Sequence, residues 1–164
     1  MTLMMTDTRA RKAPTRRRFL LLTATAAGSL GAASLLPTRG HATTEAMDAA
    51  IRAAVGNGKL QTGKVRIDLP PIVENGNAVP LTVSVESPMT ESEHVKKIHV
   101  FNEKNPQPQV AVFHFGPRSG RAAASTRIRL ADTQKVTAIA EMSDGSFWEA
   151  SMDVVVTLAA CIES

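Results

Sequence analysis

The chain has 164 residues but only one cysteine, one tryptophan and no tyrosine. A single cysteine excludes an intramolecular disulfide, so paired cysteines cannot hold this fold together. That cysteine is Cys161, three residues before Ser164 at the end of the sequence, where residues are usually exposed. An odd cysteine in a secreted protein indicates intermolecular pairing or a reactive thiol. We therefore expect the Cys161 sulfur to be presented to another molecule.

The sequence also lacks the motifs of common catalytic and metal sites. It contains no Gly-x-Ser-x-Gly motif, no P-loop and no dinucleotide-binding glycine pattern. His94, His99 and His114 lie on or beside different expected strands, without metal-ligand spacing. They are interpreted as surface or core-edge residues. A thiol hydrolase using Cys161 is an alternative, but a terminal tail lacks the preorganisation that an oxyanion site needs. We expect no enzyme activity, cofactor or metal.

The first 42 residues have the three parts of a secretory signal. An apolar but mild stretch runs from Phe19 to Leu36, and the small-residue site Gly40–Ala42 follows it. We expect cleavage after Ala42. The stretch is preceded by six basic residues, namely Arg9, Arg11, Lys12, Arg16, Arg17 and Arg18.

The basic region also fits the twin-arginine pattern, in which two arginines precede a large apolar residue. Arg16 and Arg17 form the pair, and Leu21 stands where a lysine is common. We therefore expect export to the periplasm by the twin-arginine route. The alternative is an uncleaved membrane anchor, although the apolar stretch is slightly short for the roughly 20 residues of a span.

Loss of residues 1–42 changes the charge of the chain. The whole sequence has 19 Lys and Arg against 15 Asp and Glu, a net charge of +4. Seven of these bases and one acid, Asp7, lie in the first 42 residues, which leaves 12 bases, 14 acids and a net charge of −2. The basic footprint that nucleic acids require is thus removed. We expect no nucleic-acid partner, and no membrane association after cleavage.

The remaining residues suit one domain with one hydrophobic core. Residues 45–55 have the apolar spacing of a short amphipathic helix, which Gly56–Gly58 ends. Apolar and polar residues then alternate in runs, separated by turn signals such as Glu74–Asn77 and Ser143–Ser146. The expected strands are residues 64–69, 79–87, 95–101, 110–115, 123–130, 135–142 and 147–158.

Seven short strands at this spacing predict an all-β fold, an immunoglobulin-like antiparallel β-sandwich preceded by a short helix. The expected organisation is a signal peptide at 1–42, a sandwich domain at 43–158 and a tail at 159–164. The tail carries Cys161 and is expected to leave from the edge of a sheet. Phe147 and Trp148 are adjacent in an expected strand, so their side chains face opposite sides of the sheet. We expect one ring to pack inward and the other to cover the surface or contact a partner.

Several segments resemble the SoxY family, and they occur in the same order. The match spans residues 45–161 and includes the terminal cysteine. The segments are Pro71–Gly76, Val79–Val83, Ser87–Met89, Asn105–Pro108, Arg127–Leu130, Ala138–Glu141 with Asp144-Gly145, and Val156–Leu158 followed by Cys161.

The resemblance implies a non-catalytic sulfur carrier of periplasmic thiosulfate oxidation, with an immunoglobulin-like fold. In this family a c-type cytochrome partner joins the cysteine thiol to thiosulfate, and other enzymes release sulfate and oxidise the remaining sulfur. The family also implies a heterodimer with SoxZ, a second sandwich without cysteine that is exported together with SoxY. Cys161 is the implied attachment point for the sulfur.

The tail departs from the family pattern. SoxY tails usually read Gly-Gly-Cys-Gly-Gly, whereas Ala159, Ala160, Ile162 and Glu163 surround Cys161 here. Side chains replace freely rotating glycines, so this tail is stiffer and bulkier. One alternative is a divergent SoxY-like module that binds a periplasmic dehydrogenase, with an incidental cysteine. Dimerisation through a Cys161 disulfide is another.

Overall fold

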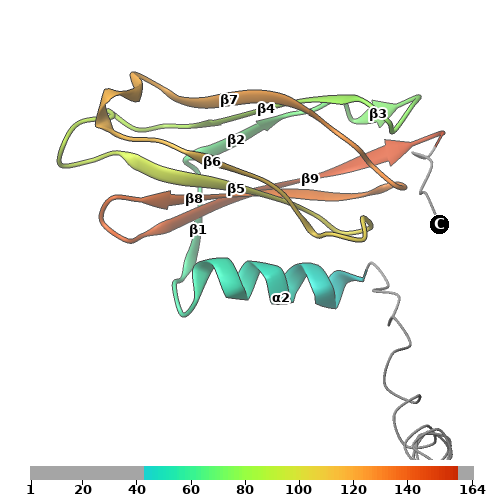
Figure 1. The fold of residues 1–164 in the computed structure, drawn as a ribbon, viewed down its shortest axis with the longest axis horizontal. Coiled ribbons are helices and arrows are strands. Elements are labelled where there is room, and N and C mark those ends of the chain that lie inside the picture. Colours follow the sequence, from blue (N-terminus) through green and yellow to red (C-terminus); the bar gives the residue numbers. More distant parts are fainter. Residues whose placement is uncertain (1–42, 159–164) are drawn as a thin grey trace, which may run out of the picture. The chain divides into compact units, whose positions relative to one another are not determined.

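Two β-sheets face each other in the computed structural model, which describes residues 43–158 (Figure 1). A helix, α2, comes first and covers the larger sheet. The elements are α2 (Thr44–Val55), β1 (Leu60–Thr62), β2 (Val65–Asp68), β3 (Ile72–Val73), β4 (Val79–Val85), β5 (Val95–Asn102), β6 (Gln109–His114), a 3-10 turn (Pro117–Ser119), β7 (Ala122–Ile128), β8 (Gln134–Met142) and β9 (Phe147–Val156).

The larger sheet has the strand order β1-β9-β8-β5-β6, with β3 also paired to β9, and the smaller sheet has the order β2-β4-β7. All seven strands expected from the sequence are present, as β2 and β4 to β9, and the pairs among them are antiparallel. The predicted sandwich is therefore confirmed. Two short strands, β1 and β3, were not expected, and both pair with β9 in parallel.

The main core lies between the two sheets and follows from the period-2 alternation of the strands. In β4, Leu81, Val83 and Val85 are buried, whereas the intervening Thr82 and Ser84 are half-buried. They meet the inward face of the larger sheet, where apolar side chains are fully buried. These include Ile98, Val100, Val136, Ala138, Ala140 and Val154.

Helix α2 packs on the outer face of the larger sheet, as Figure 1 shows. The Thr43 side chain accepts a hydrogen bond from the Ala46 amide at the start of the helix, and Gly56, with φ of 62°, ends it. Its apolar face forms a second cluster with the β5, β8 and β9 side chains Phe101, Ile139 and Phe147.

The two aromatic residues at the start of β9 face opposite sides, as expected from the strand geometry. Trp148 packs against the core between the sheets, and Phe147 packs into the α2 cluster. The Phe147 ring is therefore covered by α2 of the same chain rather than left at the surface.

The first residues of α2 lie at the same end of the sandwich as the last residues of β9 (Figure 1). Thr44 donates a hydrogen bond of 2.6 Å from Oγ1 to Glu103 Oε1, just after β5. Glu103 in turn bonds through its amide to the carbonyl of Lys135 on β8, which pairs with Asp153 near the end of β9. Within residues 43–158, no helix is long and apolar enough to cross a membrane.

Candidate functional site at the end of strand β9

The expected site residues lie outside the part of the chain that the structure describes. Cys161 and its neighbours Ala159, Ala160 and Ile162 follow Leu158, the last described residue, and the arginines Arg16 and Arg17 precede residue 43. What the structure does place is the point from which the tail departs. We call residues 155–158 the tail root.

Strand β9 is not an edge strand, which corrects the expectation that the tail leaves from a sheet edge. On one side, Val154 of β9 pairs with Gln134 of β8. On the other side, Val155 and Val156 pair with Ile72 and Val73 of β3. The strand also ends at Val156, two residues earlier than the sequence pattern indicated. The tail root therefore has a neighbouring strand on both sides.

Backbone hydrogen bonds to the β3 segment continue past the end of β9. The Val155 amide donates to Pro71 O at 2.9 Å, and the Thr157 amide donates to Val73 O at 2.9 Å. The Thr157 hydroxyl lies 3.4 Å from Val73 O and 3.3 Å from Glu74 O, so its single proton is shared between two carbonyls. Thr157 is thus held through both its backbone and its side chain.

The last described residue is also fixed. The Gly76 amide donates to Leu158 O at 2.9 Å, and Gly76 O accepts from the Leu130 amide at 2.8 Å, just after β7. The turn that positions Gly76 is closed by Asn75, whose Oδ1 accepts from the Asn77 amide at 2.9 Å. The tail root is therefore tied to both sheets of the sandwich.

A threonine on the other side of the tail root completes this arrangement. Thr133 Oγ1 accepts from the Val156 amide at 3.0 Å and lies 3.4 Å from Val156 O, to which it can donate. Thr133 precedes β8, so its hydroxyl extends the β8–β9 ladder by one side-chain contact.

Three apolar side chains at the tail root are unusually exposed. Ile72 is 65% exposed, Leu158 62% and Val155 48%, and Ile72 and Val155 are paired across β3 and β9. We call the paired Ile72 and Val155 the apolar patch. A cavity of about 310 Å³ lies against Val155, and its charged lining residues are Glu103, Lys104, Lys135 and Asp153. An apolar surface rimmed by charge is typical of a protein-binding site.

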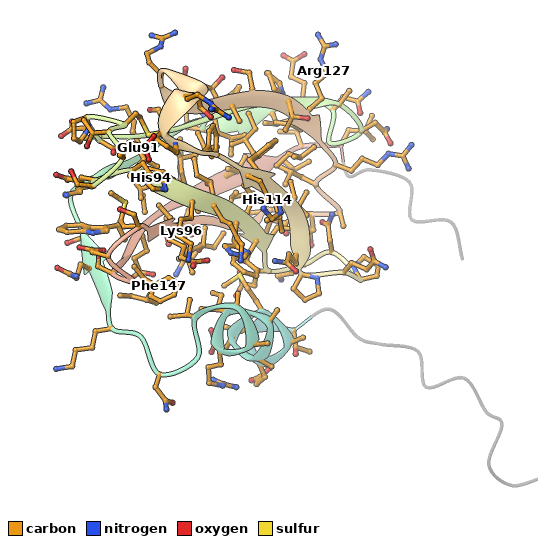
Figure 2. The ribbon with its side chains drawn as sticks, turned by 60° about the vertical axis from the view of Figure 1, so that its left-hand side comes forward. Glu91, His94, Lys96, His114, Arg127 and Phe147 are labelled. Atoms are coloured by element: carbon orange, nitrogen blue, oxygen red, sulfur yellow. The ribbon has the colours of Figure 1, made fainter. Side chains whose placement is uncertain are left out.

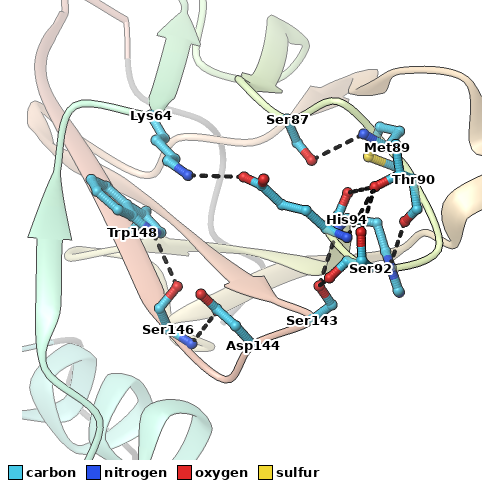
Figure 3. A network of polar contacts seen from close by, with 11 residues as sticks. Lys64, Ser87, Met89, Thr90, Ser92, His94, Ser143, Asp144, Ser146 and Trp148 are labelled. Atoms are coloured by element: carbon cyan, nitrogen blue, oxygen red, sulfur yellow. Dashed lines mark hydrogen bonds and ion pairs between the residues drawn. The ribbon is translucent and has the colours of Figure 1, made fainter.

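The histidines do not form a metal site within residues 43–158, where no cluster of three or more His, Cys, Asp or Glu side chains occurs. His94 lies in the polar network of Figure 3, where its Nδ1 is 3.1 Å from Thr90 O. That network joins the β8–β9 hairpin to the loop before β5, at the end of the sandwich away from the tail root. His99 is buried and His114 is exposed.

Comparison with known families gives a match for most of this chain. The family described as "Sulfur oxidation protein SoxY" matches residues 51–161. The chain belongs to the SoxY family. Among solved structures, the sulfur carrier protein SoxY from Chlorobium limicola f thiosulfatophilum is similar, with 30% identity and a TM-score of 0.58. The alignment covers 68% of this chain and 92% of that protein.

More distant structures share only the fold of this SoxY-family chain. A superoxide reductase (neelaredoxin) from Ignicoccus hospitalis aligns at 16% identity with a TM-score of 0.53, over 59% of this chain and 94% of its own. A putative superoxide reductase from Thermotoga maritima aligns at 21% identity with a TM-score of 0.51, over 59% and 93%. Comparison with curated proteins finds no match.

The tail-root contacts involve residues that also carry the family resemblance. Pro71, Val73, Glu74 and Gly76 belong to one segment that resembles SoxY, and all four bond to the tail root through backbone atoms. Their pairing with β9 was missed by sequence reasoning because a strand of only two residues, Ile72–Val73, has no alternation to detect. The available signal was a pair of β-branched residues between a Pro-Pro and an Asn-Gly turn.

Proposed function

We propose that this chain is a periplasmic sulfur carrier that holds intermediates of thiosulfate oxidation on the thiol of Cys161. One observation carries the proposal: the SoxY family match ends at residue 161, the position of the only cysteine in the sequence. The similarity to a solved sulfur carrier protein supports the same role. The chain itself is not an enzyme in this proposal.

The chemistry requires a thiolate, since this is the nucleophilic form of cysteine. Joining Cys161 to thiosulfate forms one sulfur–sulfur bond and releases the thiol proton and two electrons, which a c-type cytochrome partner accepts. Water then cleaves the bond to the terminal sulfonate, releasing sulfate and leaving a persulfide on Cys161. Persulfidation is a reversible modification of cysteine, so the carrier is regenerated when a further enzyme oxidises the remaining sulfur.

The fixed tail root suits this role. Leu158 is hydrogen-bonded to Gly76, and Cys161 follows three residues later. Three residues of extended chain span at most about 11 Å, so the sulfur has a short, defined working radius around the apolar patch. A partner enzyme that docks over this patch would find the thiol within that radius.

The side chains next to Cys161 bear on which enzymes it visits. Ala159, Ala160 and Ile162 restrict backbone conformations that glycine would allow. We expect the tail to fit partner channels that accommodate the Ile162 side chain. Replacing Ile162 with glycine should increase turnover with sulfur-oxidising enzymes whose natural carriers have glycine-rich tails, measured as thiosulfate-dependent electron transfer.

The proposal includes a route by which the chain reaches the periplasm together with its partner subunit. The Arg16-Arg17 pair directs the folded chain through the twin-arginine route, which suits a protein exported together with a SoxZ-like sandwich subunit lacking its own signal. Replacement of both arginines with lysine should retain the precursor in the cytoplasm. Detection of mature protein in the periplasmic fraction of that variant would contradict this route.

The carrier role is tested by intact-mass analysis of the mature protein from cells oxidising thiosulfate. Adducts should appear on Cys161 and be absent from Cys161→Ser and from cells grown without thiosulfate. If the wild-type protein carries only an unmodified thiol during active thiosulfate oxidation, the proposal fails.

The apolar patch favours a second candidate, in which the sandwich is a docking module for a periplasmic dehydrogenase and the cysteine is incidental. Ile72 and Val155 offer adjacent exposed apolar surface. In this case Ile72→Asp would abolish function in cells while Cys161→Ser would retain it. The carrier role predicts loss of function in Cys161→Ser.

A further inference from the structure

A groove of about 570 Å³ lies between helix α2 and the outer face of strands β5 and β6. This is within the size range of small-molecule sites. It is formed by elements remote in sequence from the tail and has no part in the proposed carrier chemistry. Its lining residues are Ala50, Ala53, Ala54, Lys97, His99, Gln109, Val112 and His114.

The sheet wall of the groove is rich in nitrogen donors. Lys97 and His114 are directly paired across β5 and β6, and His99 is paired with Val112 two residues further along. These side chains share one face of the sheet because alternate strand residues point the same way. No carboxylate is among the residues lining this groove.

The acidic group facing this region from the neighbouring strand is Glu141 of β8, and it is already paired. Glu141 Oε1 lies 2.5 Å from Lys96 Nζ, and its Oε2 lies 3.3 Å from Lys97 Nζ. Two ammonium groups thus share one carboxylate, which leaves an excess positive charge beside the groove. A cation would be repelled by this arrangement, and an anion would be attracted.

His99 supplies an independent indication. His99 is only 7% exposed, and its Nδ1 lies 3.0 Å from the amide nitrogen of Gln109. With the Gln109 side chain as placed, its amide nitrogen donates to Nδ1, so the neutral ring carries its proton on Nε2. Nε2 is buried and has no hydrogen-bond partner within the described residues. A buried donor without an acceptor is rare and costly, and because Nε2 itself is closed off from solvent, an oxyanion in the groove would pair with it after a small movement of the ring.

The helix wall supplies no competing polar group. Ala50, Ala53 and Ala54 present methyl groups, which leave the groove open above the donors. Val112 adds apolar surface on the sheet side. One apolar wall and one donor-rich wall together match a ligand with an anionic oxygen group at one end.

We propose that this groove is a binding site for a small oxyanion, with Lys97 and His114 as its principal ligands and Gln109 and His99 beside them. The ligand class is a carboxylate, sulfonate or sulfate-type group, whether inorganic or attached to a small organic body. The site binds independently of Cys161 and involves no covalent step.

The test is an NMR titration of the chain carrying Cys161→Ser and ¹⁵N-labelled histidine, at constant ionic strength. Sodium thiosulfate, sodium sulfate and sodium benzoate are the probes, with sodium chloride as the reference salt. Saturable shifts of the His99 and His114 ring nitrogens are expected with at least one oxyanion. Tighter binding of benzoate identifies an organic ligand, and tighter binding of sulfate or thiosulfate an inorganic one.

Variants locate the site. Lys97→Met should weaken binding about tenfold or more, because a hydrogen bond to a charged group contributes roughly 1.5 kcal/mol or more. His114→Gln, a change at an exposed position, should also weaken it. Arg127→Met removes the same charge from β7, on the side of the sandwich away from α2 in Figure 2, and should leave the affinity unchanged.

The proposal is overturned if the shifts do not saturate, if chloride reproduces them at equal ionic strength, or if Arg127→Met weakens binding as much as Lys97→Met. The titration uses a variant without Cys161, so a negative result would not contradict the proposed carrier role. Equally, evidence against the carrier role would not change the result of the titration.

Discussion

Thr157 offers a way to loosen the tail root without altering the core of the sandwich. Replacement by valine removes the hydroxyl that lies 3.4 Å from Val73 O and 3.3 Å from Glu74 O. It keeps the backbone bond from the Thr157 amide to Val73 O. Valine is also β-branched, so the strand preference of the site is retained.

The expected loss is small and local. A neutral hydrogen bond contributes about 0.5–1.5 kcal/mol net, and one proton shared between two long contacts at an exposed residue belongs near the lower end. A local loss of about 0.5–1 kcal/mol corresponds to a roughly two- to fivefold increase in the opening equilibrium. Global unfolding in urea should change by no more than this amount.

Native-state hydrogen exchange measures the opening directly. The amides of Val155, Thr157 and Gly76 should exchange roughly two to five times faster in Thr157→Val. A matched control is Thr62→Val on β1, the other short strand parallel to β9, where the hydroxyl has no hydrogen bond to another of residues 43–158. Unchanged exchange at all three amides, or an equal change in the control, would refute the role of the hydroxyl.

Two further predictions concern the fold. Gly58→Ala should destabilise the protein by about 1–3 kcal/mol, because a Cβ at this position would lie 2.6 Å from Phe147 Cε2. Gly116→Ala is the control and should be nearly neutral, because a Cβ there would have no atom within 4 Å. The midpoints of thermal unfolding compare the two variants. The pKa of Glu141 is held below its ordinary value of 4.5, chiefly by its hydrogen bond from Lys96. The ionised carboxylate therefore stabilises the fold above pH 4.5, and this stabilisation is lost as the pH falls below 4.5. Glu141→Gln should lower the urea midpoint at neutral pH and make its decline below pH 4.5 shallower; an unchanged pH profile would contradict the pairing.

The sequence predicted the parts of the fold in which a period is repeated. The alternation of Leu81, Val83 and Val85 marks β4 as a half-buried strand, and the spacing of apolar residues in 45–55 marks α2. Turn chemistry was equally informative at Gly145, which has φ of 81° in the β8–β9 hairpin. Each of these signals is local, so a single sequence contains it in full.

Long-range pairing could not be read in the same way. The contact between Ile72–Val73 and the end of β9 joins segments more than 80 residues apart. Neither segment contains a local pattern that identifies the strand with which it pairs. The surroundings of His99 were also beyond reach, since its burial depends on Gln109, Phe101 and α2 meeting at one place on the sheet. The cysteine was recognisable from its position alone, but the contacts that hold Leu158 were not.

The start of α2 and the end of β9 share one end of the sandwich (Figure 1). In the proposed carrier role, the first residues of α2 therefore lie beside the face on which partner enzymes would dock. An affinity tag fused directly to Thr43 would lie close to that face, so binding experiments on the proposed carrier should use a tag-free protein that begins at Thr43.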